Sequence, residues 1–338
     1  MTSIKLNLGE RGYTVTVGSG LIERANEYFN LDRRVFVLTD SGVPSKYAKA
    51  VASGCKDSFI YTVQAGEESK SLSTLEKVLT AMMDFKMTRR DALVCVGGGV
   101  VGDLGGFAAS VYMRGIDFYN VPTTLLSQVD SSIGGKTAVN LANTKNIVGA
   151  FYQPKAVLID ILTLKTLPKR HISSGLSEVI KMSLTSNAKL FEFLEKEDTC
   201  EGNYEKIITE ALLIKKSVVE EDEKESGLRK ILNFGHTLGH GIEANGELSE
   251  LYHGECVALG MLPVCSEEVR KRLIPVLKKN GLPTEYKKDI DSALKYTVHD
   301  KKAEADGVDA VLVDKVGTWE IKRLSLGDFS AMVKKIFK

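Results

Sequence analysis

Three of the five histidines in this chain lie close together, in the segments LNFGHTLGHGIE and LYHGE. His236 and His240 stand four residues apart, which places both on one face of a helix, and His253 completes a stretch of 18 residues. Neutral imidazoles grouped with a carboxylate suit a divalent metal such as Zn²⁺ that keeps one position open for substrate. Spacing alone therefore predicts a metal centre held by these three histidines. Three carboxylates are candidates to join them: Glu178, Glu243 and Glu255.

A glycine-rich segment, ALVCVGGGVVGDLGGFAAS, follows a strongly apolar run. Its glycines from Gly97 to Gly102 fit the pattern G-x-G-x-x-G, which lets backbone N–H groups approach a pyrophosphate at a helix N-terminus. The segment follows the third strand of a series, whereas the usual dinucleotide fingerprint follows the first. A tight turn with close helix packing is the alternative. Asp40 ends an earlier predicted strand, where it could accept a ribose hydroxyl or cap a helix.

A second polar stretch, NVPTTLLSQVDSSIGGKTAVNLANTKNIVGAFYQP, concentrates charged and amide side chains. It contains Asp130, Lys136, Lys145 and Asn146, and Arg114 lies shortly upstream. Because the chain as a whole is nearly neutral, this local basic density predicts an anionic ligand. The alternative is a solvated loop, which the length and the small residues of the stretch disfavour.

Composition excludes several classes of partner. The 338 residues include 45 Lys and Arg against 44 Asp and Glu, a net charge of +1, so there is no electrostatic footprint for nucleic acid or an anionic membrane. No apolar run approaches the roughly 20 residues that span a bilayer. The first residues lack the apolar core of a signal peptide, and the five scattered cysteines form no CxxC pair. We therefore expect free thiols and a cytoplasmic location.

The predicted secondary structure that positions these groups differs between the two halves of the chain. Residues 3–8 and 13–17 predict a hairpin, and apolar runs at 34–40, 58–63, 92–96, 118–121 and 156–160 predict further strands. Intervening helices, such as one over 72–85, indicate βαβ units and a mostly parallel sheet. After Pro168 long amphipathic stretches predict helices, with a late hairpin about Gly317. We therefore expect an α/β domain over 1–167 and a mainly helical domain over 168–338.

Taken together, these motifs closely resemble the 3-dehydroquinate synthase family. The resemblance rests on GGGVVGDLGGFAAS, YMRGIDFYNVPTTLLSQVDSSIGGKTAVN, KNIVGAFYQP, TLKTLP, SGLSEVIK, GLRKILNFGHTLGH and HGECVALGM, in the family's order over roughly residues 40–305. It implies an N-terminal Rossmann-like parallel-sheet domain, a mainly α-helical C-terminal domain, and an active site in the cleft between them. It also implies NAD, one divalent metal (Zn²⁺ or Co²⁺), a small sugar phosphate substrate, and a homodimer in which Arg114 reaches the neighbouring site.

Carried over residue by residue, the resemblance assigns three sets of side chains. The metal ligands become Glu178, His236 and His253, which moves His240 to the substrate. The substrate and catalytic set is Arg114, Asp130, Lys136, Asn146, Lys181, Lys215, Arg229, Asn233, His240 and Lys301, with Lys302 as an alternative to Lys301. The NAD set is Asp40, Gly66, Glu67, Lys70, Gly98, Gly99, Val100, Val101, Gly102, Asp103, Thr123, Thr124, Lys136, Lys145, Thr163, Leu164, Lys165 and Thr166.

The implied reaction is a carbon–oxygen lyase reaction (EC 4.2.3.4) of the shikimate pathway to chorismate and the aromatic amino acids. It converts 3-deoxy-D-arabino-heptulosonate 7-phosphate to 3-dehydroquinate and phosphate by transient oxidation, phosphate elimination, reduction, ring opening and aldol cyclisation. Arg229 and Lys215 would hold the substrate carboxylate, since fixed cations bind carboxylates strongly. The phosphate would be held by Lys136, Asn146, Asn233 and Arg114.

Three other functions remain as alternatives. A metal- and NAD-dependent polyol dehydrogenase of the same fold would release NADH, but a polyol gives Lys136, Lys215 and Arg229 nothing to bind. Another sugar phosphate cyclase, such as one that makes an aminocyclitol precursor, would act on a substrate without the carboxylate. A non-enzymatic NAD sensor would need no histidine cluster.

Overall fold

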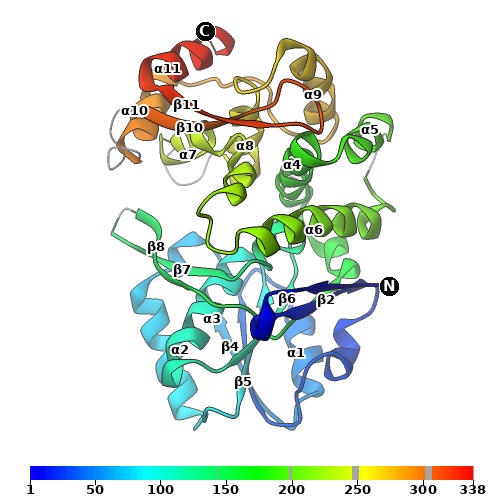
Figure 1. Cartoon of the computed structure of the whole chain (residues 1–338). Helices are drawn as coiled ribbons and strands as arrows, with labels where there is room; N and C mark the ends of the chain where they lie inside the picture. The colour runs from blue at the N-terminus through cyan, green and yellow to red at the C-terminus, as the bar shows by residue number, and fades with distance from the viewer. Residues whose placement is uncertain (143, 198–199, 246–250, 301–306, 338) are drawn as a thin grey trace. The chain divides into compact units, whose positions relative to one another are not determined.

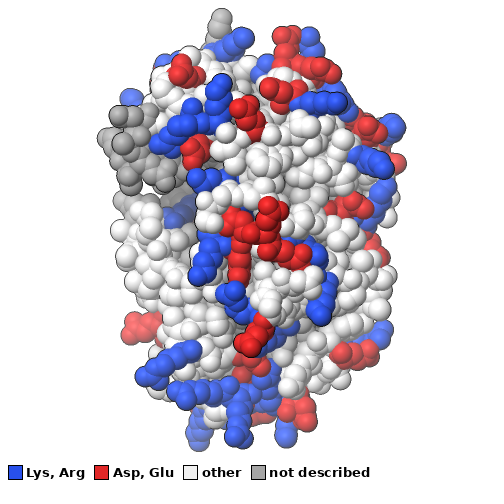
Figure 2. Space-filling model, in the orientation of Figure 1, with Lys and Arg blue, Asp and Glu red and all other residues white. Residues whose placement is uncertain are grey.

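The chain forms two compact units, Met1–Leu167 and Pro168–Lys338, which Figure 1 shows in one view. The computed structural model describes residues 1–142, 144–197, 200–245, 251–300 and 307–337. No described helix is long and apolar enough to cross a membrane. On the face drawn in Figure 2, acidic and basic side chains are mixed over the upper part, while Lys and Arg side chains gather at the lower end. The predicted fold class, an α/β domain followed by a mainly helical one, is confirmed.

A seven-stranded sheet forms the centre of the first unit. Its strand order is β1 (Thr2–Leu6), β2 (Tyr13–Gly18), β9 (Ala156–Asp160), β6 (Asp117–Pro122), β5 (Ala92–Gly97), β3 (Arg34–Asp40) and β4 (Asp57–Val63). β1 and β2 pair antiparallel, as the predicted hairpin requires, and every other neighbouring pair is parallel. Each strand that the apolar runs predicted is present.

Helices cover both faces of this sheet. α2 (Leu72–Asp84) and α3 (Gly99–Val111) lie on one side and α1 (Ser45–Ser53) on the other (Figure 1). Successive side chains of a strand point to opposite faces, so Phe36 and Leu38 enter the core under α2 and α3, whereas Val35 and Val37 enter the core under α1. Because both of their faces are buried, the central strands β3 and β5 contain continuous apolar runs, whereas β1 at the edge alternates between buried and exposed residues.

The polar stretch after β6 is ordered secondary structure and not a solvated loop. It contains a π-helical turn, Ser127–Ser131, and the antiparallel strands β7 (Lys136–Leu141) and β8 (Thr144–Phe151). α3 packs closely on β7 and β5, since a Cβ on Gly106 would lie 2.5 Å from the Cγ2 of Thr137 and one on Gly105 would lie 2.3 Å from the Sγ of Cys95. These two glycines therefore allow α3 to pack closely on both strands.

The second unit is built from eight helices of the described chain and one hairpin. The helices are α4 (Lys169–Ser186), α5 (Ala188–Lys196), α6 (Tyr204–Glu221), α7 (His236–Asn245), α8 (His253–Met261), α9 (Glu267–Lys279), α10 (Ile290–Asp300) and α11 (Leu326–Ile336). Pro168 is the N-cap of α4. The predicted late hairpin is confirmed as β10 (Gly307–Leu312) and β11 (Glu320–Ser325), with Gly317 at φ +85° in the turn.

Two glycines bring α8 against its neighbours. A Cβ on Gly254 would lie 2.0 Å from the carbonyl oxygen of Ser174 on α4. A Cβ on Gly260 would lie 1.9 Å from the carbonyl oxygen of Gly235, which precedes α7. Only glycine allows these backbone approaches. The start of α8 is thereby held beside α4, and the start of α7 is held beside the end of α8.

Asp222, directly after α6, closes a tight loop that leads to the 3-10 helix η7 (Leu228–Asn233). Its Oδ1 accepts hydrogen bonds from the backbone N–H of Ser226 at 2.9 Å and from the Ser226 hydroxyl at 3.1 Å. Its Oδ2 accepts from the N–H of Gly227 at 2.7 Å and of Arg229 at 3.0 Å. The bond from the Arg229 N–H, with the others, holds the pKa of this carboxyl well below its usual range.

Replacing this carboxylate should destabilise the protein in a pH-dependent way. Since the folded pKa is depressed, the stabilisation is complete above the unfolded pKa of about 4 and is lost as the pH falls towards the folded value. We expect Asp222→Asn to lower the free energy of unfolding by about 2 kcal/mol at pH 7. Urea unfolding between pH 7 and pH 2 measures it, with Asp314→Asn, an exposed carboxylate of the same unit, as the control. A difference that does not shrink below pH 4 would contradict this role.

Candidate active site

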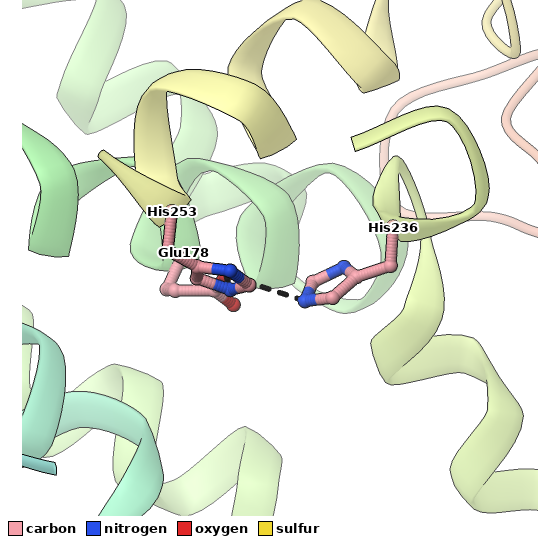
Figure 3. Close-up of side chains that lie close together, drawn as sticks. All are labelled: Glu178, His236 and His253. Carbon is pink, nitrogen blue, oxygen red and sulfur yellow. Dashed lines mark ion pairs between the residues drawn. The ribbon is translucent and has the colours of Figure 1, made fainter. Parts of the chain in front are cut away.

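Glu178, His236 and His253 point towards one another from α4, α7 and α8 (Figure 3). One ligand atom of each lies within 4.8 Å of the others. The Nε2 atoms of His236 and His253 lie 3.6 Å and 3.5 Å from Oε1 of Glu178. The structure thus gathers the set that the family resemblance implied, although Glu178 stands far from the histidines in sequence.

The donor set fits a divalent cation. Glu178 is 0% exposed, its Oε2 pairs with Lys181 Nζ, and its Oε1 has no hydrogen-bond partner among the described residues. Buried carboxylate oxygens are normally hydrogen-bonded, so an Oε1 without such a bond, faced by two imidazole nitrogens, is suited to a metal. Two nitrogens and one oxygen also match catalytic zinc sites with three protein ligands.

His240 lies beside this cluster but not in it. Its ring centroid is 5.3 Å from that of His236 and 6.0 Å from that of His253. Its ligand atom instead forms a second group with Glu243 and His253, again within 4.8 Å, and the residue is exposed. The ligand set predicted from spacing alone, three histidines, therefore differs from the group that surrounds Glu178.

Electrostatics separate the protonation states of the cluster. Burial would raise the pKa of Glu178, but Lys181 and the two histidines outweigh it and hold that pKa well below its usual range. Burial, with the charge of Lys181, lowers the pKa of His236 well below its usual value. Burial also opposes charging of His253, yet its contacts with Glu178 and Glu243 raise its pKa to about 10. A metal ion would therefore meet an ionised carboxylate and a neutral His236, and would displace a proton from His253.

Glu255, another candidate carboxylate, serves a structural contact. Arg170 Nε lies 2.7 Å from Oε1 of Glu255 and its Nη2 lies 2.7 Å from Oε2, and the N–H of Tyr252 donates to Oε2 at 2.8 Å. The Arg170 guanidinium also stacks 4.1 Å from the centroid of the Tyr252 ring. These contacts fasten the first turn of α8, and hence His253, to the first turn of α4.

The predicted substrate cations of this unit are buried. Lys181 is 2% exposed, Lys215 on α6 is 5% exposed and Arg229 on η7 is 2% exposed. Arg229 donates from Nη1 to the carbonyl oxygen of Glu223 in the loop that Asp222 closes. Lys301 lies outside the described residues.

Glu225, which the sequence did not indicate, contacts a predicted site residue. Its Oε1 accepts a hydrogen bond of 2.8 Å from Nδ2 of Asn233, a predicted substrate residue, and its backbone has φ +61°. The surrounding run, EEDEKES, has the composition of a solvated surface. No sequence signal distinguishes this glutamate from its acidic neighbours.

The predicted NAD residues of the first unit follow the carboxyl ends of neighbouring parallel strands. β5 ends at Gly97, Gly98 is the N-cap of α3, and the helix begins at Gly99. Asp40 ends β3 and Thr123 follows β6, while Thr163 lies just after β9. A ligand of an open α/β sheet binds at this edge. A Cβ on Gly98 would lie 3.0 Å from Cγ2 of Thr124, so glycine keeps the turn narrow.

Lys70 contacts residues of both the predicted NAD set and the predicted substrate set. Its Nζ is 2.8 Å from Oδ2 of Asp103 and 3.5 Å from Oε1 of Glu67, both in the predicted NAD set. It also donates to Oδ1 of Asn146, which the resemblance gave to the substrate. Burial lowers the pKa of Lys70, but Asp103 and Glu67 outweigh it and raise that pKa. Asp130 lies in the π-helical turn, Lys136 begins β7 and Lys145 lies on β8.

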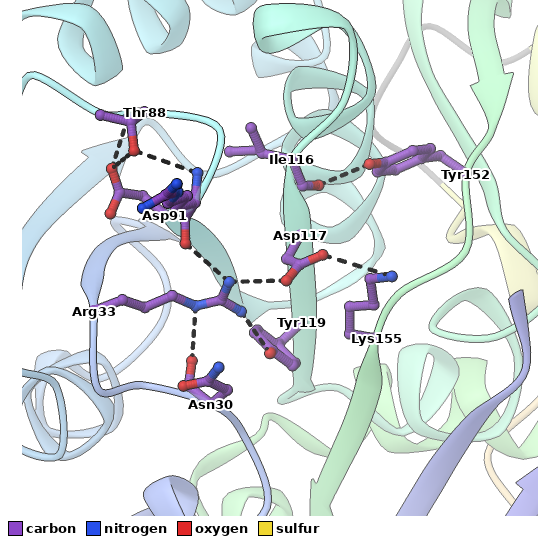
Figure 4. Close-up of polar contacts among 10 residues, drawn as sticks. Asn30, Arg33, Thr88, Asp91, Ile116, Asp117, Tyr119, Tyr152 and Lys155 are labelled. Carbon is purple, nitrogen blue, oxygen red and sulfur yellow. Dashed lines mark hydrogen bonds and ion pairs between the residues drawn. The ribbon is translucent and has the colours of Figure 1, made fainter. Parts of the chain in front are cut away.

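Arg114 occupies a different part of the first unit. It ends the 3-10 turn Tyr112–Arg114 in an exposed position with φ +69°, and lines a surface hollow of about 790 Å³ with Thr88, Arg89, Arg90 and Met113. Arg90, which also lines this hollow, belongs to a polar network drawn in Figure 4: Arg33 donates to the carbonyl oxygen of Arg90 at 3.1 Å, to Oδ2 of Asp117 at 2.8 Å and to the hydroxyl of Tyr119 at 2.7 Å.

Comparison with known proteins tests the family resemblance. The family models described as 3-dehydroquinate synthase N-terminal and C-terminal match residues 60–174 and 175–303. The 3-dehydroquinate synthase of Clostridium beijerinckii is 40% identical over 98% of this chain and 100% of its own length.

Two solved structures are similar throughout. A 2-deoxy-scyllo-inosose synthase complexed with carbaglucose-6-phosphate, NAD⁺ and Co²⁺ has a TM-score of 0.87 at 28% identity, over 99% of this chain and 100% of its own. The 2-epi-5-epi-valiolone synthase of Streptomyces hygroscopicus subsp. jinggangensis, with NAD⁺ and Zn²⁺ bound, has a TM-score of 0.87 at 26% identity, over 96% of each chain. The resemblance drawn from the motifs is confirmed: the chain belongs to the 3-dehydroquinate synthase family.

Proposed function

We propose that this chain converts 3-deoxy-D-arabino-heptulosonate 7-phosphate to 3-dehydroquinate and phosphate, as a carbon–oxygen lyase of aromatic amino acid biosynthesis. Family membership gives the enzyme class. The observation that carries the proposal is the cluster of Glu178, His236 and His253 with Lys181 beside it. A substrate with a carboxylate and a phosphate gives the buried cations of the same unit their ligands.

The cofactors are NAD and one divalent metal ion, zinc or cobalt. Two similar enzymes carry NAD⁺ with Co²⁺ or with Zn²⁺, and the donor set around Glu178 suits either ion. When bound, NAD supplies a reversible hydride acceptor for carbon 5 of the sugar, and the metal supplies a Lewis acid for the oxygens beside it. Glu178, His236 and His253 would hold the metal, and the predicted set at the carboxyl edge of the sheet would hold NAD.

The remaining residues bind and orient the substrate. Arg229 and Lys215 hold its carboxylate, and the anchored loop after α6 fixes the direction of the Arg229 guanidinium. Asn233, oriented by Glu225, binds the phosphate with Lys136 and Asn146. His240 is exposed and lies beside the metal cluster, so it moves a proton at the substrate.

The proposal extends to assembly and location. We propose a cytoplasmic homodimer in which Arg114 contributes to the site of the neighbouring subunit. Its exposed position on the turn after α3 makes the side chain accessible to a second subunit. All five cysteines are free thiols, as expected for a reducing compartment.

A catalytic amount of NAD⁺ should support many turnovers. Because the hydride returns to the substrate, phosphate release from the heptulosonate phosphate should continue with no accumulation of NADH absorbance. Colorimetric phosphate detection with continuous absorbance at 340 nm measures both. Stoichiometric NADH formation with a polyol would instead assign the chain to the polyol dehydrogenases.

Metal content should separate ligands from substrate residues. We expect Glu178→Gln, His236→Ala and His253→Ala to lose metal on dialysis, since each removes a donor. His240→Ala should keep the metal and lower kcat by about 10²–10⁴-fold. Metal analysis of the four purified variants decides it. A metal-free His240→Ala beside a loaded Glu178→Gln would refute the ligand assignment.

Two inactive variants should complement each other if Arg114 acts across subunits. In a mixed dimer of Arg114→Ala and Lys136→Ala, one site regains both residues. Random exchange should then restore about one quarter of the wild-type activity. Absence of rescue, with subunit exchange verified by mass spectrometry, would place Arg114 in its own subunit's site or outside the chemistry.

A further inference from the structure

The ring of His253 lies between two carboxylates. Its Nε2 faces Oε1 of the buried Glu178 at 3.5 Å, and its Nδ1 lies 3.2 Å from Oε2 of Glu243 on α7. His236, His240 and Glu243 follow at i, i+4 and i+7, so they form one stripe along α7. α7 and α8 approach closely through Gly239, where a Cβ would lie 3.2 Å from the carbonyl oxygen of Cys256.

His236 presents the same arrangement with a different acceptor. Its Nε2 also faces Oε1 of Glu178, at 3.6 Å, while its Nδ1 lies 3.2 Å from the carbonyl oxygen of Phe234. A neutral imidazole has one lone pair and one N–H, so a ring that gives Nε2 to a metal must carry its proton on Nδ1. Each ring therefore has a hydrogen-bond acceptor for its Nδ1–H: the backbone carbonyl of Phe234 for His236, and the carboxylate of Glu243 for His253.

We propose that Glu243 is a positioning residue for the metal centre, which accepts the Nδ1–H of His253 and so directs the Nε2 lone pair of that ring at the ion. This inference rests on the metal ligands of the proposed function. Carboxylates in this outer position fix the tautomer and ring orientation of metal-binding histidines in many proteins.

The alternative is that Glu243 is itself a ligand, in the second group with His240 and His253. His253 belongs to both groups and has a single lone pair when neutral, so it serves only one ion. The group around Glu178 has a fully buried carboxylate, whose Oε1 faces both imidazole Nε2 atoms and has no hydrogen-bond partner in the described part of the chain. The ion therefore belongs with Glu178, and Nδ1 of His253 is left to donate to Glu243.

Metal affinity of the purified protein tests the inference. Competition with a chelator for Zn²⁺ gives the Kd, and the absorption of the Co²⁺-loaded protein gives the coordination. We expect Glu243→Ala to raise the Kd about 10–100-fold and leave the Co²⁺ coordination unchanged. Glu243→Gln should retain part of the affinity, since its amide oxygen still accepts the N–H. Glu210→Gln, which removes a carboxylate of the same unit that binds Asn187, serves as the matched control with wild-type affinity.

A double-mutant comparison separates an indirect role from a direct one. If Glu243 acts through the ring, Glu243→Ala should cause no further loss of affinity in a His253→Ala background. A loss that persists there, or an altered Co²⁺ spectrum, would make Glu243 a ligand and overturn the inference. If Glu243→Ala binds metal as tightly as the wild type while His253→Ala loses metal, the inference about Glu243 is overturned and the proposed ligand set still stands. Full metal binding by His253→Ala would instead remove the ligand set on which the proposed function rests.

Discussion

A single buried carboxylate fixes the arrangement of the second unit. An ionised Glu178 with no exposure would cost on the order of several kcal/mol in desolvation if it had no charged or polar neighbours. Lys181 on the same helix and the rings of His236 and His253 compensate this cost. Because those rings begin α7 and α8, both helices must start within reach of one point on α4. The backbone contacts at Gly254 and Gly260, and the pairing of Arg170 with Glu255, meet that requirement.

The first unit is organised by the common direction of its strands. Parallel strands end at one edge of a sheet, so residues far apart in sequence gather there whenever each follows a strand. Asp40, Gly98, Thr123 and Thr163 each stand within three residues of a strand end. The order and direction of the strands are enough to bring these four residues to one edge of the sheet. The helix that begins at Gly99 then presents its N-terminal N–H groups at this edge.

The sequence predicts what is periodic or local, and it is weaker where distant segments meet. The sheet follows from apolar runs buried on both faces, and the late hairpin follows from Gly317. β7 and β8 escaped prediction because Lys136, Asn140 and Lys145 interrupt their short apolar segments, which then resemble a loop.

The metal cluster shows the same limit. Spacing grouped His236 with His240 and His253 and left Glu178 as one of three candidate carboxylates. Glu178 reaches the histidines through the packing of α4 against α8, and only the family resemblance chose it over the other two. Proximity in sequence likewise could not separate Glu243 from Glu255, since what differs is the partner: the ring of His253 for one and Arg170 for the other. Glu225 likewise differs from its acidic neighbours in sequence only by its partner, Asn233.

The second unit buries charged groups, which lowers its stability but prepares these groups to bind an anionic ligand. Lys181, Lys215 and Arg229 are almost fully buried, and such cations are costly in an interior unless anions lie nearby. Two carboxylates anchor the segments that carry Lys181 and Arg229: Glu178 pairs with Lys181, and Asp222 holds the backbone of Arg229. Groups held in this way need little reorganisation when a ligand binds, so the proposed anionic substrate would gain affinity from charges already in place. Its binding would in turn stabilise the protein, because the substrate would interact with the folded state alone.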